Sequence, residues 1–261
     1  MIDLHCHLLP GIDDGPRDME TAIELARAAA VDGVETAAAT PHVRPDHPRV
    51  VPSELAERCG ELGERLFAEG VELELVPGGE VDLLWALEAS DDDLRLCSYG
   101  QLGTDLLVET PYDPLLPTFE DMLFRLTLKG HRILLAHPER NPTFQGDPNR
   151  LAALVQRGVL LQVTADSLMR APRQSRSAEL ARRLVLDGLT HVLASDAHGA
   201  TTVERASLGE SADRASDLVG AQRARWLVED APAAIAAGRP LPPMPAAEPR
   251  RRGLVSRLRR G

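Results

Sequence analysis

The sequence predicts an α/β fold in which parallel strands alternate with helices. Seven short apolar or alternating runs recur along the 261 residues, and most of them precede a segment whose apolar residues have helical spacing. Strand and helix units that alternate at this length form parallel sheets. With seven or eight such units, a barrel is favoured over an open sheet. No glycine-rich nucleotide-binding loop follows any run, which disfavours a nucleotide-cofactor fold.

The first predicted strand has the clearest pattern. Apolar and polar residues alternate over residues 2–8, and this period of two is typical of a strand. Side chains two apart lie on one face of a strand, so His5 and His7 should converge and can bind one metal ion. Pro10 and Gly11 then end the strand. The predicted strands are residues 2–7, 34–40, 71–77, 106–109, 133–137, 159–164 and 192–196.

Helices are predicted between these strands. Residues 18–32 are rich in alanine and have apolar residues at helical spacing, with Asp18 as a possible N-cap and Gly33 as the stop. Residues 53–69 form a second such segment that ends before Gly70. The same criteria predict helices at residues 118–129, 149–157, 175–187 and 221–229.

Composition and charge narrow the class of protein. The chain is 43% hydrophobic and 26% charged, as in ordinary soluble globular proteins. It has no apolar run of the roughly 20 residues that a membrane span needs, and no N-terminal secretion signal. Three cysteines without a repeating spacing do not suggest disulfides, so we expect a cytoplasmic protein.

The net charge of −11 is unevenly distributed. Residues 246–261 carry six arginines and one glutamate, a net of +5, which leaves the rest of the chain at −16. A body this acidic is poorly suited to nucleic acid, because binding to DNA depends on neutralising phosphates. It suits a site that concentrates divalent cations.

The composition predicts one large domain at residues 1–240 and a tail at residues 241–261. From Gly238 onward the chain is rich in proline and then in arginine, a pattern typical of disorder. An alternative for the tail is a short basic amphipathic helix, with Leu254, Val255 and Leu258 on one side, that makes weak contact with a membrane surface.

Metal-ligating residue types follow six of the seven predicted strands; only residues 159–164 offer no strong ligand. In a βα barrel the C-terminal ends of the strands form the rim on which active sites are built. A single histidine or glutamate near a strand end is ordinarily a hydrogen-bonding or ion-pairing residue, and we interpret His47, His131 and His191 in that way. Nine such residues on one rim would repel each other or lack partners without cations. The candidate ligands are His5, His7, Asp14, His42, Glu80, Glu109, His137, Asp196 and His198.

Mixed histidine and carboxylate ligands suit Mn²⁺, Fe²⁺ or Zn²⁺ better than Ca²⁺ or a cysteine-rich structural zinc site. Nine ligands are too many for one ion and fit two or three, while Asp13 is interpreted as a turn residue without a ligand role. Such clusters activate water and clamp phosphate oxygens during in-line displacement. Phosphoester hydrolysis is therefore the leading reaction class, and metal-dependent amide hydrolysis or deamination is the competing one.

Residues 59–65 match the C-x5-R spacing of cysteine-dependent tyrosine phosphatases. The match lies inside a charged helical pattern rather than after a strand, and its glutamates would repel phosphate and raise the pKa of a thiol. We therefore reject Cys59 as a nucleophile. Cys6 alternates away from the histidines of the first strand and is interpreted as a core residue.

Six short motifs resemble, in their order along the chain, those of the PHP (polymerase and histidinol phosphatase) family: D-L-H-C-H, T-P-H, G-G-E-V, V-E-T, A-H-P-E-R and S-D-A-H-G. The segment P-G-I-D-D-G-P near the N-terminus resembles more narrowly the bacterial manganese-dependent protein-tyrosine phosphatases of the CpsB type, which act in capsule and exopolysaccharide regulation. The resemblance extends from Met1 to about Pro240. It does not include the arginine-rich tail.

The resemblance implies a distorted (β/α)7 barrel that holds three metal ions, most simply Mn²⁺. It also implies that Arg140 contacts the phosphate, for which a guanidinium is well suited, and that metal-held hydroxide attacks phosphorus directly. Arg44 is a weaker candidate for the same role. One departure is Asn141, where we expect an aromatic or other bulky residue. The implied ion sites are His5, His7, Glu80 and Asp196, with Glu80 bridging to a second ion on Glu109 and His137, and a third ion on Asp14, His42 and His198.

The resemblance implies a phosphotyrosine-protein phosphatase that acts on the tail of a bacterial tyrosine kinase. The alternative is a small-molecule phosphomonoesterase such as histidinol-phosphate phosphatase, which would share every metal ligand. A polymerase-associated nuclease is opposed by the acidic body and the lack of a polymerase domain. A non-catalytic regulator is opposed by the intact ligand set.

Overall fold

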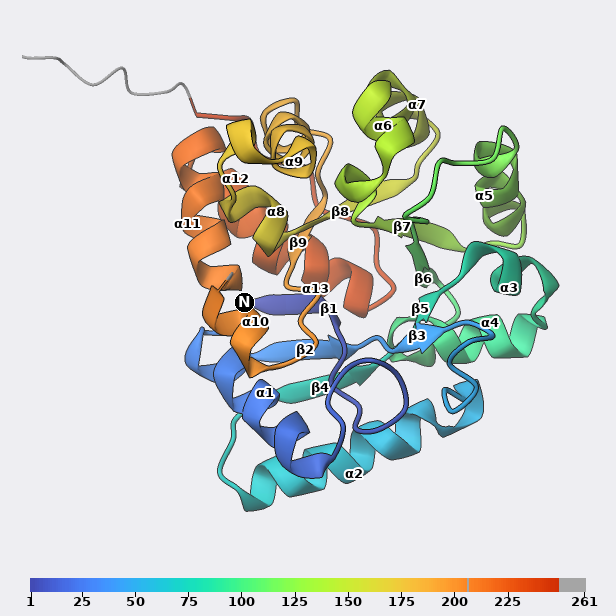
Figure 1. Ribbon diagram of the computed structural model, residues 1–261, viewed down its shortest axis with the longest axis vertical. Coiled ribbons are helices and arrows are strands. Elements are labelled where there is room, and N and C mark those ends of the chain that lie inside the picture. Colours follow the sequence, from blue (N-terminus) through green and yellow to red (C-terminus); the bar gives the residue numbers. More distant parts are fainter. Residues whose placement is uncertain (206, 249–261) are drawn as a thin grey trace, which may run out of the picture.

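The structure is a computed structural model that describes residues 1–205 and 207–248. It confirms an α/β fold with parallel strands, around which the helices are placed (Figure 1). The strands are β1 (Ile2–Cys6), β2 (Thr36–Ala39), β3 (His42–Val43), β4 (Glu74–Pro77), β5 (Glu80–Val81), β6 (Asp105–Glu109), β7 (Arg132–Ala136), β8 (Leu160–Thr164) and β9 (Val192–Ala194).

The α-helices are α1 (Met19–Val31), α2 (Leu55–Ala68), α3 (Leu83–Glu88), α4 (Asp91–Cys97), α5 (Phe119–Leu128), α6 (Pro142–Gly146), α7 (Asn149–Gln156), α8 (Ala165–Met169), α9 (Arg176–Leu186), α10 (Ala200–Arg205), α11 (Leu208–Val219), α12 (Ala221–Arg225) and α13 (Ala231–Ala236). Short 3₁₀ turns lie at η1 (Pro52–Glu54), η2 (Tyr99–Gln101), η3 (Pro138–Arg140) and η4 (Pro172–Gln174), and a π-helical turn at η5 (Trp226–Asp230). Among the described helices, none is long and apolar enough to cross a membrane.

Within the described residues the strands form two parallel sheets, β1-β2-β4 and β3-β5-β6-β7-β8-β9, rather than one closed sheet. Two backbone hydrogen bonds nevertheless connect the chain after β9 with the end of β1: Asp196 N donates to His5 O at 2.8 Å, and His7 N donates to Ala197 O at 2.9 Å. The parallel α/β part of the predicted barrel is thus confirmed, and regular closure is not.

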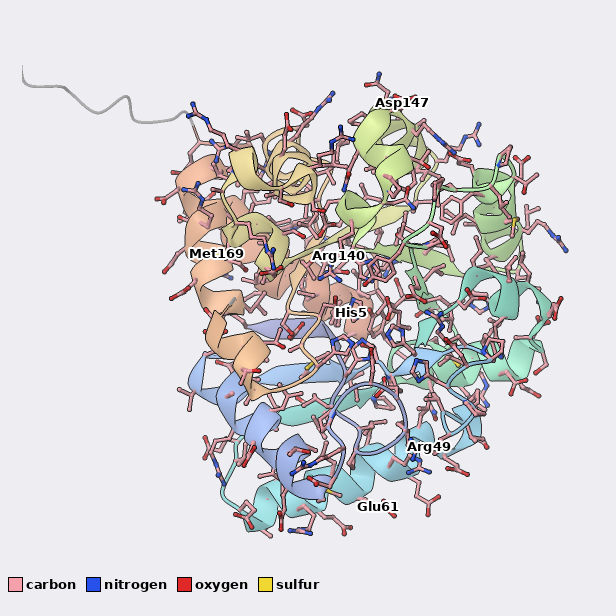
Figure 2. All side chains as sticks on the ribbon, in the orientation of Figure 1. His5, Arg49, Glu61, Arg140, Asp147 and Met169 are labelled. Atoms are coloured by element: carbon pink, nitrogen blue, oxygen red, sulfur yellow. The ribbon has the colours of Figure 1, made fainter. Side chains whose placement is uncertain are left out.

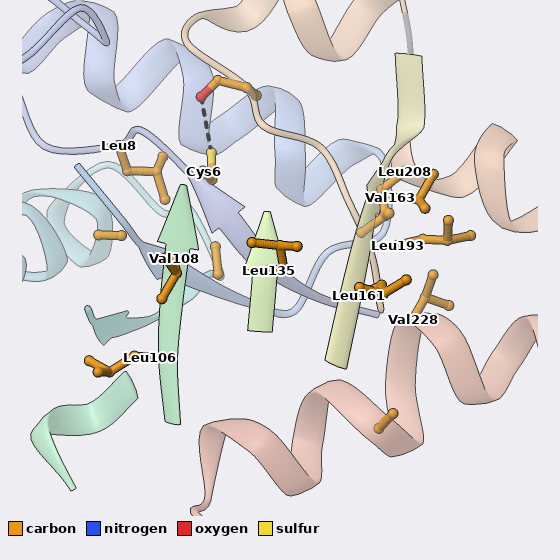
Figure 3. Packing of buried hydrophobic residues seen from close by; sticks show 14 of the residues in the cluster. Cys6, Leu8, Leu106, Val108, Leu135, Leu161, Val163, Leu193, Leu208 and Val228 are labelled. Atoms are coloured by element: carbon orange, nitrogen blue, oxygen red, sulfur yellow. Dashed lines mark hydrogen bonds between the residues drawn. The ribbon is translucent and has the colours of Figure 1, made fainter. Parts of the chain in front are cut away.

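Alternation along the strands separates two apolar clusters. Leu106 and Val108 of β6 belong to a large cluster that includes residues of the surrounding helices, and Figure 3 shows this side of the strands. Leu107 belongs to a smaller cluster contributed mainly by the strands. Because side chains two apart share a face, Glu109 follows Leu107 and Gln162 follows Leu160 on the side of the smaller cluster. This apolar layer therefore lies beneath the polar rim.

Each predicted strand overlaps an observed one, and β3 and β5 are additional two-residue strands. The predicted helix at residues 18–32 is α1, and Asp18 caps it by accepting from Thr21 N. Several helices were not predicted, among them α3, α4 and α11. In the predicted tail, the Trp226 indole donates to Pro242 O and Glu248 N donates to Val219 O, so residues 241–248 pack against the body. Residues 249–261, with the leucines and valine of the proposed membrane contact, lie outside the described residues.

Candidate metal centre

The nine candidate ligands meet at the C-terminal ends of the strands. β1 supplies His5, and His7 follows it; His42 and Glu80 begin β3 and β5; Glu109 ends β6; His137 follows β7; Asp196 and His198 follow β9; Asp14 lies on the loop before α1. Figure 2 shows His5 and Arg140 at the centre of the molecule. In four groups of these residues the ligand atoms lie within 4.8 Å of one another: His5 with His7 and Asp196; His5 with Glu80 and His137; His42 with Glu80 and Glu109; and His7 with Asp14, His42 and His198.

The first histidine pair is close enough to share an ion. The Nε2 atoms of His5 and His7 are 3.3 Å apart, although the pairing of β1 with β2 is irregular between Asp3 and Cys6. Asp196 Oδ1 lies 3.3 Å from the first Nε2 and 3.5 Å from the second. Ligands about 2.1 Å from a divalent ion lie about 3.0–3.4 Å apart in octahedral or tetrahedral geometry. The observed spacing fits a cation bound among these three side chains.

Glu80 is fully buried at the middle of the cluster. Its Oε2 lies 3.4 Å from His5 Nε2 and 2.9 Å from His42 Nδ1, and its Oε1 lies 2.9 Å from His137 Nε2. Burial alone raises the pKa of Glu80, but the charge of His5 and the hydrogen bond from His137 lower that pKa overall. The carboxylate is therefore ionised and belongs to two of the four groups, as a bridging ligand would.

Several buried atoms of the cluster lack hydrogen-bond partners among the described residues. They include Glu80 Oε2 and His42 Nδ1, which lie 2.9 Å apart but do not form a hydrogen bond with each other. Burial and the nearby Glu80 also raise the pKa of Glu109, because two carboxylates are crowded together. Unpaired buried polar atoms and crowded carboxylates are costly unless a cation compensates them. The donor set thus fits divalent ions.

The group formed by His7, Asp14, His42 and His198 lies nearer to solvent than the others. Asp14 Oδ1 is 3.2 Å from His198 Nε2 and 3.6 Å from His42 Nε2, and the Asp14 side chain is 56% exposed. The hydrogen bond with His198, together with nearby histidine charge, lowers the pKa of Asp14. An ion held here would be the most accessible to a substrate.

Two candidate ligands have unusual backbone conformations. His137 (φ 35°) and Asp196 (φ 53°) lie in the left-handed region, which costs about 1–3 kcal/mol for residues other than glycine. Gln162 Oε1 accepts from His137 N at 3.0 Å, and His5 O accepts from Asp196 N. These bonds hold both strained residues at the ends of their strands.

Two residues that orient the histidines, Asp13 and Gln162, were not predicted from the sequence. Asp13, interpreted as a turn residue without a ligand role, lies in the bend after β1, and its carboxylate also accepts from His7 Nδ1 at 2.7 Å and from His42 N at 3.1 Å. Gln162 Oε1 lies 3.1 Å from His5 Nδ1. A metal-binding histidine commonly donates its second ring N–H to such a partner. The sequence signal for Gln162 was a polar residue inside an apolar run. The structure buries this residue in β8.

Two arginines face the cluster. Arg140, on η3, donates from Nη1 to Asp196 Oδ2, and the nearby acidic groups raise its pKa despite its burial. Arg44 donates from Nη1 to both carboxylate oxygens of Glu109, at 3.2 and 3.1 Å. Both arginines line a cavity of about 540 Å³ together with candidate ligands. The cavity can therefore accept a phosphate group beside the cluster.

The three histidines interpreted as structural, His47, His131 and His191, lie in different parts of the molecule. His131 and His191 precede β7 and β9, at the opposite ends of the strands from the cluster. The ring of His191 accepts from Leu161 N, and burial lowers its pKa to about 4. His47, in contrast, lines the cavity and stacks on His42 with ring centroids 5.3 Å apart.

The cysteines do not contribute to the cavity lining. Cys59 lies on α2 with 5% of its surface exposed, and burial raises the pKa of its thiol to about 12. A thiol with that pKa is protonated at neutral pH and is a poor nucleophile. Cys6 is buried in the large apolar cluster, where its thiol donates to Ala197 O (Figure 3).

Comparisons with known proteins agree with this geometry. The family model for capsular polysaccharide synthesis, CpsB/CapC, matches residues 1–237. Tyrosine-protein phosphatase YwqE of Bacillus subtilis is 36% identical over 203 residues, which cover 77% of this chain and 79% of that protein. Putative tyrosine-protein phosphatase CapC of Staphylococcus aureus is 29% identical over 202 residues, 77% of this chain and 78% of that protein.

A solved structure shows the same fold. It comes from work on YwqE of Bacillus subtilis and CpsB of Streptococcus pneumoniae, described as unique metal-dependent tyrosine phosphatases. It superposes with a TM-score of 0.82 at 31% sequence identity, and the match covers 96% of this chain and 100% of the other.

Proposed function

Because the chain belongs to the CpsB/CapC family of capsular polysaccharide synthesis, we propose that it is a metal-dependent protein-tyrosine phosphatase. The observation that carries the proposal is the convergence of nine histidine and carboxylate ligands on one rim, beside a cavity lined by Arg140. The relatives are named as tyrosine-protein phosphatases. Hydrolysis of a phosphomonoester is the reaction that this set of side chains suits best.

The four ligand groups are proposed to hold two or three Mn²⁺ ions, and Fe²⁺ and Zn²⁺ suit the same donors. Ions bound there supply Lewis acidity to the phosphate oxygens and an activated water as nucleophile. His5, His7 and Asp196 would hold one ion. Glu80 would bridge, with His137, His42 and Glu109 as further ligands, and Asp14 and His198 would complete the most exposed site.

The other residues of the cavity bind and orient the substrate. Arg140 is proposed to exchange its contact with Asp196 for the phosphate oxygens, which a guanidinium binds through paired hydrogen bonds. Arg44 adds positive charge on the side of Glu109. Since no described cysteine lines the cavity, the proposed reaction has no phosphocysteine intermediate.

The proposed substrate is a tyrosine-phosphorylated protein, in particular the tail of a bacterial tyrosine kinase. The assignment of the family to capsular polysaccharide synthesis supports this choice. A cytoplasmic location belongs to the same proposal, supported by the free thiols of the three cysteines.

We also propose that the fold is a distorted (β/α)7 barrel of the PHP type at residues 1–240, followed by a tail at residues 241–261, of which residues 241–248 pack against the body. In this barrel, β2 and β3 together form one strand with a short break, and β4 and β5 form another. The bonds Gly78 N to Ala39 O and Glu80 N to Pro41 O, which bridge the interruption, support it. So do the bonds between β1 and the residues after β9.

Phosphate release from a phosphotyrosine peptide and from histidinol phosphate tests the proposal. We expect the peptide to be the better substrate, with release that requires Mn²⁺, stops with a chelator and is lost when His5→Ala and His7→Ala are combined. Faster release from histidinol phosphate would favour the small-molecule phosphatase. Peptide turnover that survives chelation would refute the metal mechanism.

A further inference from the structure

Tyr112 is an aromatic residue at the mouth of the cavity that no candidate ligand set includes. It lies on the loop after β6, and its side chain is 59% exposed. Its ring stacks on that of His137, with centroids 5.7 Å apart and an interplanar angle of 20°. Its hydroxyl accepts from Arg140 Nη1 at 3.2 Å. An exposed aromatic ring thus lies between a candidate ligand and the proposed phosphate-binding arginine.

Asn141 holds this ring in place. Its side chain is fully buried, and Nδ2 donates to Pro111 O at 2.6 Å and to Asp113 O at 2.9 Å. These two carbonyls flank Tyr112 in the chain. Asn141 Oδ1 accepts from Thr143 N at 2.8 Å, so the amide is anchored to the start of α6. The loop is fixed by a residue that follows Arg140 directly.

Among the described residues that line the cavity, Tyr112 is the one with a phenyl ring. The other lining residues are six of the nine candidate ligands, two arginines, Asp46 and His47. Aromatic rings attract each other in offset-stacked or edge-to-face arrangements beyond simple burial of area. A phosphate bound by Arg140 brings its substituent next to Tyr112, because the two side chains are in contact.

We propose that Tyr112 packs against the phenyl ring of the bound phosphotyrosine and sets the preference for aryl over alkyl phosphates, and that Asn141 is its positioning residue. The inference rests on the proposed function and deepens it. It also accounts for Asn141 at a position where a bulky residue was expected: the aromatic group comes from the loop after β6 and is held by the asparagine.

Inhibition by two phosphonates tests this role. A phosphonate has no leaving group, so its inhibition constant reports binding and not the rate of bond cleavage. Phenylphosphonate and ethylphosphonate compete with a phosphotyrosine peptide, and the inhibition constant Ki is measured for each on the Mn²⁺-loaded full chain. In Tyr112→Ala we expect Ki for phenylphosphonate to rise about tenfold, and Ki for ethylphosphonate to change less than about twofold. Tyr112→Phe keeps the ring and should keep the ratio of the two constants near that of the wild type.

Further variants at Phe67 and Asn141 complete the design. Phe67→Ala removes an aromatic side chain that is 88% exposed on α2, outside the cavity lining, and should leave both constants unchanged. Asn141→Ala should resemble Tyr112→Ala, and adding it to Tyr112→Ala should change the ratio no further. Should Asn141→Ala not fold, Asn141→Gln, whose amide is displaced by one methylene, takes its place with the same expectation.

The outcomes separate the inference from the function on which it rests. An equal rise of both constants in Tyr112→Ala would overturn the inference. So would a rise in Ki for phenylphosphonate in Tyr112→Phe as large as in Tyr112→Ala, because the role would then belong to the Tyr112 hydroxyl that accepts from Arg140. Additive effects of the two substitutions would overturn the positioning role of Asn141. A wild-type protein that does not hydrolyse the peptide would refute the proposed function itself.

Discussion

The Asp13→Ala variant should weaken metal binding although Asp13 is not a candidate ligand. Its carboxylate accepts three hydrogen bonds: from His7 Nδ1 at 2.7 Å, from His42 N at 3.1 Å and from Gly15 N at 3.1 Å. Without it, the His7 ring loses the partner that fixes its orientation. Losing such a partner typically costs about 10- to 100-fold in metal affinity, equivalent to about 1.4–2.7 kcal/mol.

Calorimetric titration of chelator-treated protein with Mn²⁺ measures this change. Since unsatisfied buried N–H groups also cost about 1–3 kcal/mol of stability, thermal unfolding is measured alongside. Asp18→Ala is the matched control. It removes the N-cap of α1 and should lower the free energy of unfolding, with Mn²⁺ affinity unchanged. Affinity within twofold of the wild type in Asp13→Ala would refute the orienting role.

Three further predictions concern other parts of the molecule. Gln162→Leu removes the acceptor shared by His5 Nδ1 and His137 N, so the Mn²⁺ concentration needed for half-maximal activity should rise about tenfold or more; an unchanged concentration would contradict it. Cys59→Ser should keep peptide hydrolysis, because burial raises the pKa of that thiol to about 12; loss of hydrolysis in a folded variant would show that the C-x5-R segment is functional. Burial lowers the pKa of His191 to about 4, so between pH 6.5 and 4 the unfolded chain takes up a proton that the folded chain does not. The free energy of unfolding should therefore fall by up to about 3 kcal/mol as the pH drops through this window, and the fall should be smaller in His191→Gln, as denaturant titrations at several pH values would show.

The strands and longer helices could be predicted because their determinants are local. Alternation around His5, the cap at Asp18 and the stop at Gly33 are all read within a few residues. The two-residue strands β3 and β5 have no such pattern, since their neighbours in the sheet define them: His42 pairs with Glu80, and Glu80 with Leu107. The short helices α3 and α4 are likewise too brief for periodicity to distinguish them.

The residues of the candidate centre could be predicted, and their partners could not. The topology of a parallel fold brings strand ends together, so a set of His, Asp and Glu at those ends is visible in the sequence. Gln162 and His5, however, are 157 residues apart, and their contact depends on how β8 lies beside the cluster. The left-handed conformations of His137 and Asp196 also arise from tertiary bonds.

The grouping of the candidate ligands matches only part of the one that the family resemblance implies, since Glu109 and His137 fall in different groups. His5, His7 and Asp196 remain together, as do Asp14, His42 and His198. His7 also belongs to the second of these groups, and Glu80 is shared between two others. The ligand groups thus overlap through shared side chains, which favours ions that lie close together.

The number of ions that the chain binds tests the central claim most directly. The measurement is equilibrium dialysis against Mn²⁺ followed by elemental analysis, on the wild type and on Glu80→Ala. The nine candidate ligands and the shared position of Glu80 predict two or three ions per wild-type chain, and at least one fewer in the variant. One ion or none in the wild type, or the same number in both proteins, would contradict a bridged metal cluster.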